Sequence, residues 1–175
     1  MSSKRKFQFI FLFCVGLLTT LFFSVVSLMS TAKAIPWQPA NQYFEATVLE
    51  QIIKDNTTLP PIGLDKQIRV QELLHQPRLV LIDFNSEQVC GQLGCAYSIY
   101  LEQGNSFQPV FKQYLNPYLP PDVKLMELGD YPSWESALPC LVIHQLVESG
   151  LQNTQVCYLR DSYQITEKTV TALAD

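Results

Sequence analysis

The sequence contains few of the residues from which catalytic sites are usually assembled. Of its 175 residues only two are histidines, His75 and His144, and neither lies at a catalytic spacing from a nucleophile or a carboxylate. It has no GxSxG motif, no closely spaced CxxC pair and no CxxCH haem-attachment motif. These absences favour a non-catalytic protein, and they leave open chemistry by carboxylates that meet only in space.

Basic residues are scarce beyond the first 34 positions. Four of the 12 Lys and Arg residues lie within those positions, whereas all 16 Asp and Glu residues follow them. Residues 35–175 therefore carry eight basic and 16 acidic side chains, a net charge of about −8. Binding to nucleic-acid phosphates depends on clustered Lys and Arg. Nucleic acid is therefore not an expected partner.

Residues 1–34 have the pattern of a secretory signal peptide. Three basic residues at positions 4–6 precede an uncharged apolar run over residues 7–29, and alanines follow at positions 32 and 34, where a signal peptidase requires small side chains. We expect cleavage before Ile35 and export to a periplasm, an internal lumen or the medium. The apolar run is also long enough to cross a bilayer, so retention as a membrane anchor is the alternative, and the only expected membrane contact.

Residues 35–175 are expected to form a single disulfide-stabilised α+β domain. The predicted fold is an N-terminal helix packed on a largely antiparallel sheet of about five to seven strands that ends in a hairpin. Helical periodicity predicts a helix with Asn41 as its N-cap that ends at Asn56. Strand patterns and turn residues predict strands at residues 67–74, 79–84, 96–101, 107–115, 123–128, 140–147 and 154–164.

Four cysteines follow the signal segment, and an even number in an exported chain predicts two disulfides. They are Cys90, Cys95, Cys140 and Cys157. Three pairings are open, and we favour the two that join neighbours in sequence. If the last hairpin turns at residues 148–149, Cys140 and Cys157 are equidistant from the turn and face each other across it.

Residues 90–95 read CGQLGC, in which glycines beside both cysteines permit a tight covalent loop. A structural disulfide is the preferred interpretation. A redox pair is the alternative, although four intervening residues depart from the two-residue spacing of redox motifs. A zinc site would need all four cysteines reduced and close together, so we predict neither a metal nor a cofactor.

The remaining polar and aromatic residues have structural interpretations. We expect His75 to be a solvated loop residue and His144 to be half-buried and hydrogen-bonded in a strand, on the same face as Cys140. Most carboxylates should be solvated, among them Asp83, Glu87, Asp130, Glu135, Asp161 and Glu167. Seven tyrosines between positions 97 and 163 favour sheet packing, with a recognition surface as the alternative.

The segments CGQLGC-AYSIYL and CYLRDSYQI resemble those of small exported bacterial β-rich domains of uncharacterised function, in which a CGxxGC turn leads into an alternating strand. The resemblance covers residues 79–165. It implies an exported bacterial β-rich domain and implies no activity. The second cysteine pair and the proline-rich segment before the strands depart from that pattern.

The leading functional hypothesis is a non-catalytic binding or structural domain of the cell envelope, or a secreted one, with a protein or cell-wall partner. The rival is an extracytoplasmic thiol-disulfide enzyme that uses Cys90 and Cys95. A third interpretation is a membrane-tethered structural protein that keeps residues 1–34.

Overall fold

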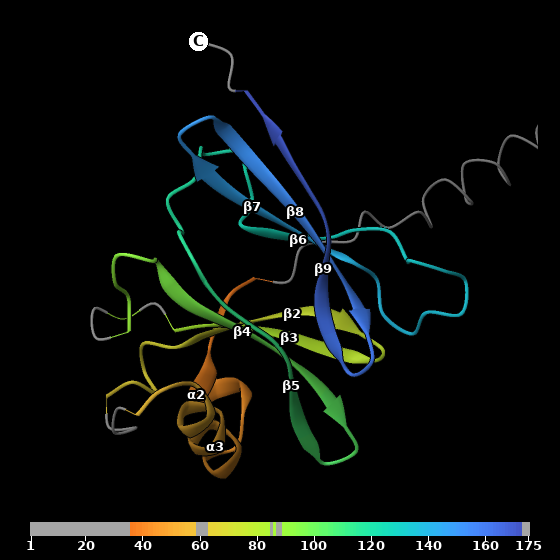
Figure 1. Ribbon diagram of the computed structural model, residues 1–175. Coiled ribbons are helices and arrows are strands. Elements are labelled where there is room, and N and C mark those ends of the chain that lie inside the picture. Colours follow the sequence, from red (N-terminus) through yellow and green to blue (C-terminus); the bar gives the residue numbers. More distant parts are fainter. Residues whose placement is uncertain (1–35, 59–62, 85, 87–88, 173–175) are drawn as a thin grey trace, which may run out of the picture. The chain divides into compact units, whose positions relative to one another are not determined.

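The strands of the described residues form two antiparallel sheets (Figure 1). The computed structural model describes residues 36–58, 63–84, 86 and 89–172, so the predicted signal peptide and Glu87 lie outside the described residues. The first sheet has the order β1-β2-β3-β4-β5, formed by Gln38–Pro39, Arg69–His75, Arg78–Asp83, Cys95–Gln103 and Ser106–Leu115. The second has the order β6-β7-β8-β9, formed by Met126–Leu128, Leu141–Val147, Gly150–Leu159 and Ser162–Thr171.

Strand β3 is buried on both faces, which explains its continuous apolar sequence. Leu79 and Leu81 belong to a core shared with strands β7, β8 and β9 of the second sheet. Val80 and Ile82 point the opposite way, into a core shared with the helices α2 (Ala40–Tyr43) and α3 (Ala46–Asn56). Side chains alternate between the faces of a strand. The first sheet is therefore a middle layer, with the helices on one face and the second sheet on the other.

The predicted antiparallel sheet architecture is confirmed, but the strands form two sheets and the helical content is low. A continuous helix from Asn41 to Asn56 is wrong. The backbone is extended at Phe44 and Glu45, so α2 ends after one turn and Glu45 precedes α3. The ring of Phe44 packs edge-on against Phe107 at a centroid distance of 4.9 Å. This contact with β5 joins residues distant in sequence, which helical periodicity does not reveal.

The last predicted strand, residues 154–164, is also wrong, because the chain turns within it. Strand β8 ends at Leu159, and β9 runs back from Ser162 to Thr171. Arg160 and Asp161 form the turn with φ angles of 52° and 75°. Hairpin turns with positive φ at both central residues usually contain glycine or asparagine. Arg and Asp at these two positions therefore predict this turn only weakly.

The register of the β7–β8 hairpin agrees with the prediction. Leu141 faces Val156, Val147 faces Gly150, and residues 148–149 form the turn. Val123–Leu128 shortens to β6, and the strands predicted at residues 67–74, 79–84, 96–101 and 107–115 correspond to β2, β3, β4 and β5. Turn position and strand alternation were sufficient for these elements.

A buried polar network connects α3 to the middle of the first sheet. The side-chain amide of Asn56 donates to the backbone oxygen of Ile52 at 2.8 Å and to the hydroxyl of Tyr100 at 2.7 Å. The hydroxyl of Ser98 donates to the amide oxygen of the same asparagine. Asn56, Ser98 and Tyr100 are 8%, 1% and 0% exposed. The network therefore satisfies polar groups that water cannot reach.

We expect Asn56→Ala to lower the free energy of unfolding by about 2–4 kcal/mol, because it leaves two buried hydroxyl groups without their partner. Urea denaturation followed by circular dichroism measures this change. Gln51→Ala, on the exposed side of the same helix, is the matched control and should change stability by less than about 0.5 kcal/mol. Equal effects of the two substitutions would contradict the role assigned to the network.

Candidate functional site

Both preferred cysteine pairs lie at disulfide distance. Cys90 and Cys95 have an S–S distance of 2.10 Å, and Cys140 and Cys157 one of 1.97 Å. Cys140 is fully buried, and Cys95 and Cys157 are buried to 5% and 3% exposure, whereas Cys90 is half-buried. Two disulfides indicate an oxidising, extracytoplasmic environment.

The first disulfide closes the short loop that precedes β4. The backbone N–H of Gly91 donates to the oxygen of Gly94 at 2.9 Å, and the N–H of Gly94 donates to the oxygen of Gly91 at 3.0 Å. Gly94 has a φ of 102°, and a Cβ atom there would lie 2.3 Å from the backbone oxygen of Leu115. Glycine is therefore required where the loop meets β5, and Leu93 is left 78% exposed at the loop tip.

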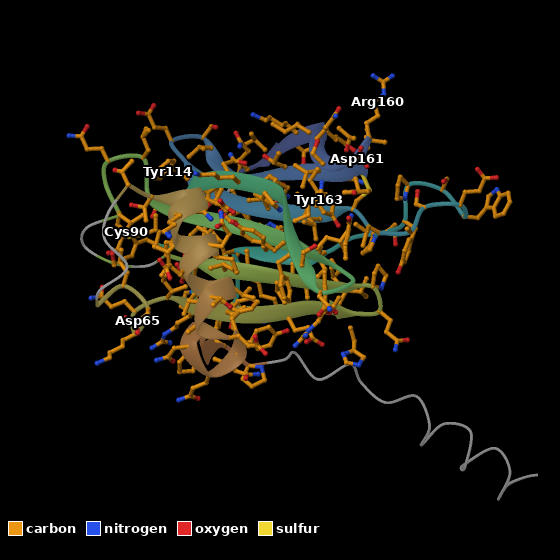
Figure 2. The ribbon with its side chains drawn as sticks, turned by 90° about the horizontal axis from the view of Figure 1, so that it is seen from below. Asp65, Cys90, Tyr114, Arg160, Asp161 and Tyr163 are labelled. Atoms are coloured by element: carbon orange, nitrogen blue, oxygen red, sulfur yellow. A yellow bond between two sulfur atoms is a disulfide. The ribbon has the colours of Figure 1, made fainter. Side chains whose placement is uncertain are left out.

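A pocket with a volume of about 390 Å³ lies beside this disulfide, between the closed loop and the segment that follows β5. It is lined by Cys90, Gly91, Gln92, Gly94, Cys95, Asn116, Pro117 and Tyr118. Its volume is within the range of small-molecule sites. Tyr118 is 81% exposed at its edge. Figure 2 shows Cys90 and Tyr114 at one end of the sheets, and Arg160 and Asp161 at the other.

The second disulfide lies at the base of a projecting loop, residues 129–139, between β6 and β7 (Figure 1). Backbone hydrogen bonds join its two ends, from Gly129 N–H to Cys140 O at 2.8 Å and from Cys140 N–H to Asp130 O at 2.9 Å. The hydroxyl of Tyr163 donates to the oxygen of Pro139 at 3.0 Å. The base of the loop is therefore held by covalent and hydrogen bonds.

The loop of residues 129–139 exposes two aromatic side chains. Trp134 is 91% exposed and Tyr131 is 53% exposed. The loop also carries Asp130 and Glu135 and has no basic residue. Large aromatic side chains on a soluble domain mark interaction sites when they are exposed together. No functional role was predicted for residues 129–139 from the sequence, although a Trp among Pro and Ser residues was an available signal.

The two histidines have structural partners and lie far apart in the fold. His75 ends β2 and is exposed, with Nδ1 at 2.8 Å from Glu72 Oε1. His144 is 13% exposed and its Nδ1 lies 2.7 Å from Asn153 Oδ1, as expected for a half-buried strand residue. In the described part of the chain, no group of three His, Cys, Asp or Glu side chains could hold a metal ion.

The prediction that Asp83 is solvated is wrong, because its exposed fraction is only 8%. It lies directly opposite Tyr97 in the β3–β4 ladder. Burial first, and then the charge of Asp83 and a hydrogen bond to it, raise the pKa of Tyr97 above its ordinary value. The tyrosine stays protonated and donates to the carboxylate, which is a structural arrangement.

Tyr43, Glu72 and Arg78 form a cluster of charged and polar groups on neighbouring elements. The hydroxyl of Tyr43 donates to Glu72 Oε2 at 2.7 Å and accepts from Arg78 Nε at 2.9 Å. The guanidinium carbon of Arg78 lies 4.7 Å from the centre of the Tyr43 ring. Burial alone would raise the pKa of Glu72, but hydrogen bonds from Tyr43, His75 and Arg78 outweigh burial and lower it. These groups pair with one another, which favours a structural role.

No protein-family model, curated protein or solved structure matches this chain. None of the helices within the described ranges is long and apolar enough to cross a membrane.

We expect the two disulfides to differ in their reaction with a mild reductant under native conditions. Because Cys90 is half-buried while both cysteines of the other pair are buried, Cys90–Cys95 should be reduced first. Alkylation at increasing reductant concentration, followed by peptide mass spectrometry, measures the order. Reduction of Cys140–Cys157 before or together with Cys90–Cys95 would contradict this assignment.

We expect the ionisation of Tyr43 to lower the stability of the folded protein at alkaline pH. Burial first, and then the hydrogen bond to Glu72, raise the pKa of Tyr43 to about 12, against about 10 in an unfolded chain. The unfolded chain therefore loses this proton first, so stability falls as the pH rises from about 10 to 12. We expect Tyr43→Phe to make this fall shallower in denaturation curves, and to remove one phenol from the absorbance titration at 295 nm. An unchanged slope would refute the assignment.

Proposed function

We propose that the protein is an exported, non-catalytic domain of the cell envelope that binds a protein partner through the loop of residues 129–139. The observation that supports this function most strongly is the 91% exposure of Trp134 on a loop whose base is held by hydrogen bonds and adjoins a disulfide. Exposing a tryptophan to water is unfavourable unless a partner covers it. Tryptophan is also among the residues that contribute most to binding energy at interfaces.

The base of the loop reduces the entropic cost of binding. Residues 129 and 140 are joined by a backbone hydrogen bond, and Cys140 is covalently fixed to β8. A loop held before binding loses less conformational freedom when its partner docks. The carboxylates of Asp130 and Glu135 favour a partner whose indole-binding pocket has a basic rim, because complementary charge increases the association rate.

The proposed location follows from the sequence and from the disulfides. We propose cleavage of residues 1–34 and folding of residues 35–175 in a periplasm, an internal lumen or the medium. The two disulfides support an oxidising compartment. If residues 1–34 are kept instead, they would tether the same binding domain to the membrane.

A thiol-disulfide enzyme is the second candidate, favoured by the half-buried position of Cys90 beside a pocket. Such an enzyme must cycle between dithiol and disulfide during turnover. Trapping of mixed disulfides with a Cys95→Ala variant of the exported protein distinguishes the candidates. If the protein is a non-catalytic binding domain, we expect that no substrate protein is trapped through Cys90.

Photo-cross-linking in the native host tests the binding function. A benzophenone amino acid in place of Trp134 should cross-link a specific envelope protein, whereas the same probe in place of Gln113, an exposed residue of β5, should not. With that partner purified, Trp134→Ala should weaken binding by about 30-fold or more, the effect of losing about 2 kcal/mol at an interface hot spot.

Tyr118→Ala is the matched control in the affinity measurement, because Tyr118 is similarly exposed outside the loop of residues 129–139. The free energy of unfolding should be unchanged in Trp134→Ala, since the side chain is 91% exposed. The proposal fails if the probe at position 134 captures no protein beyond those captured at position 113.

A further inference from the structure

Among the described residues that line the pocket beside Cys90–Cys95, none carries a charged side chain, which limits what this lining can bind. Its walls consist of the disulfide, two glycines, Gln92, Asn116, Pro117 and Tyr118. Phosphates and carboxylates would lack a cationic partner there, and cations would lack an anionic one. The mature chain also carries an excess of negative charge, which disfavours anions further. The ligand that fits this lining is neutral.

Hydrogen bonds hold the wall opposite the closed loop in place. The side chain of Gln145 binds Asn116 twice, accepting from its backbone N–H at 2.8 Å and donating to its backbone oxygen at 3.1 Å. The side-chain oxygen of Asn116 then accepts from the backbone N–H of Tyr118 at 3.0 Å. These bonds fix the backbone that carries the Tyr118 ring. The wall is therefore built before a ligand arrives.

The polar groups of the pocket that can form hydrogen bonds with a ligand are side chains. Within the described part of the chain, no hydrogen bond engages the Gln92 amide, the Asn116 side-chain nitrogen or the Tyr118 hydroxyl. In contrast, the N–H groups of Gly91 and Gly94 bond across the closed loop. Both edges of β4 are already paired, with β3 and β5. A peptide that binds by adding a strand needs a free strand edge, so this pocket does not suit one.

We propose that this pocket binds a neutral sugar ring of a glycan. The ring face of Tyr118 offers a partially negative surface on which the C–H groups of a pyranose can stack. The amide of Gln92 can donate and accept, and the Asn116 nitrogen can donate, which matches neighbouring hydroxyl groups of a sugar. The pocket volume of about 390 Å³ suits a ligand of this small size. This site is separate from the loop of residues 129–139.

Titration of the oxidised full-length mature protein with neutral trisaccharides tests the proposal. The probes are N,N′,N″-triacetylchitotriose, cellotriose and maltotriose, each followed to about 10 mM by isothermal calorimetry and by amide chemical shifts. We expect at least one to bind and to shift the amide signals of Gln92 and Tyr118. Tyr118→Ala should weaken its binding at least tenfold, whereas Tyr118→Phe, which keeps the ring face, should stay within about threefold.

Tyr131→Ala is the matched control, because Tyr131 is also an exposed tyrosine but lies in the loop of residues 129–139. It should leave saccharide binding unchanged, and so should Trp134→Ala, which separates this proposal from the protein-binding function. Absence of binding by all three trisaccharides overturns the proposal. Equal weakening by Tyr118→Ala and Tyr131→Ala overturns it as well. So do saccharide-induced changes in chemical shift that are confined to amides outside the pocket.

Discussion

The burial of β3 on both of its faces is the constraint on which the rest of the structure depends. Leu79, Val80, Leu81 and Ile82 are each at most 2% exposed. Fully burying an aliphatic side chain contributes about 1.5–3 kcal/mol, so this strand alone requires a covering layer on each side. The helices supply one layer and the second sheet supplies the other. The loops at the ends of the sheets are positioned by this layered core.

The disulfides lie where this core ends and exposed loops begin. One closes the loop that exposes Leu93, and the other lies at the base of the loop that exposes Trp134. Leu93 and Trp134 are therefore both carried by loops next to a disulfide. A braced loop keeps its geometry without a large core of its own, so a domain of this size can carry the two surfaces that we propose.

Sequence patterns were sufficient where a structural signal was local. The alternation in β4 and the turn at Gly104 predicted the first long hairpin, and the turn at residues 148–149 predicted the register that sets Cys140 opposite Cys157. Patterns failed where a tertiary contact or an unusual turn decided the conformation. The helix is interrupted at Phe44, which packs against Phe107, and β9 begins after a turn without glycine.

Charge, local alternation and turn residues are properties of neighbouring positions, so the sequence alone predicted an export pattern, an acidic segment after residue 34 and a preference for the two cysteine pairs that the structure contains. Tertiary packing divides the strands into two sheets and buries Asp83. It alone brought Asn116 and Tyr118 against residues 90–95 as one pocket. These features depend on which surfaces pack together, and packing joins residues that no local pattern relates.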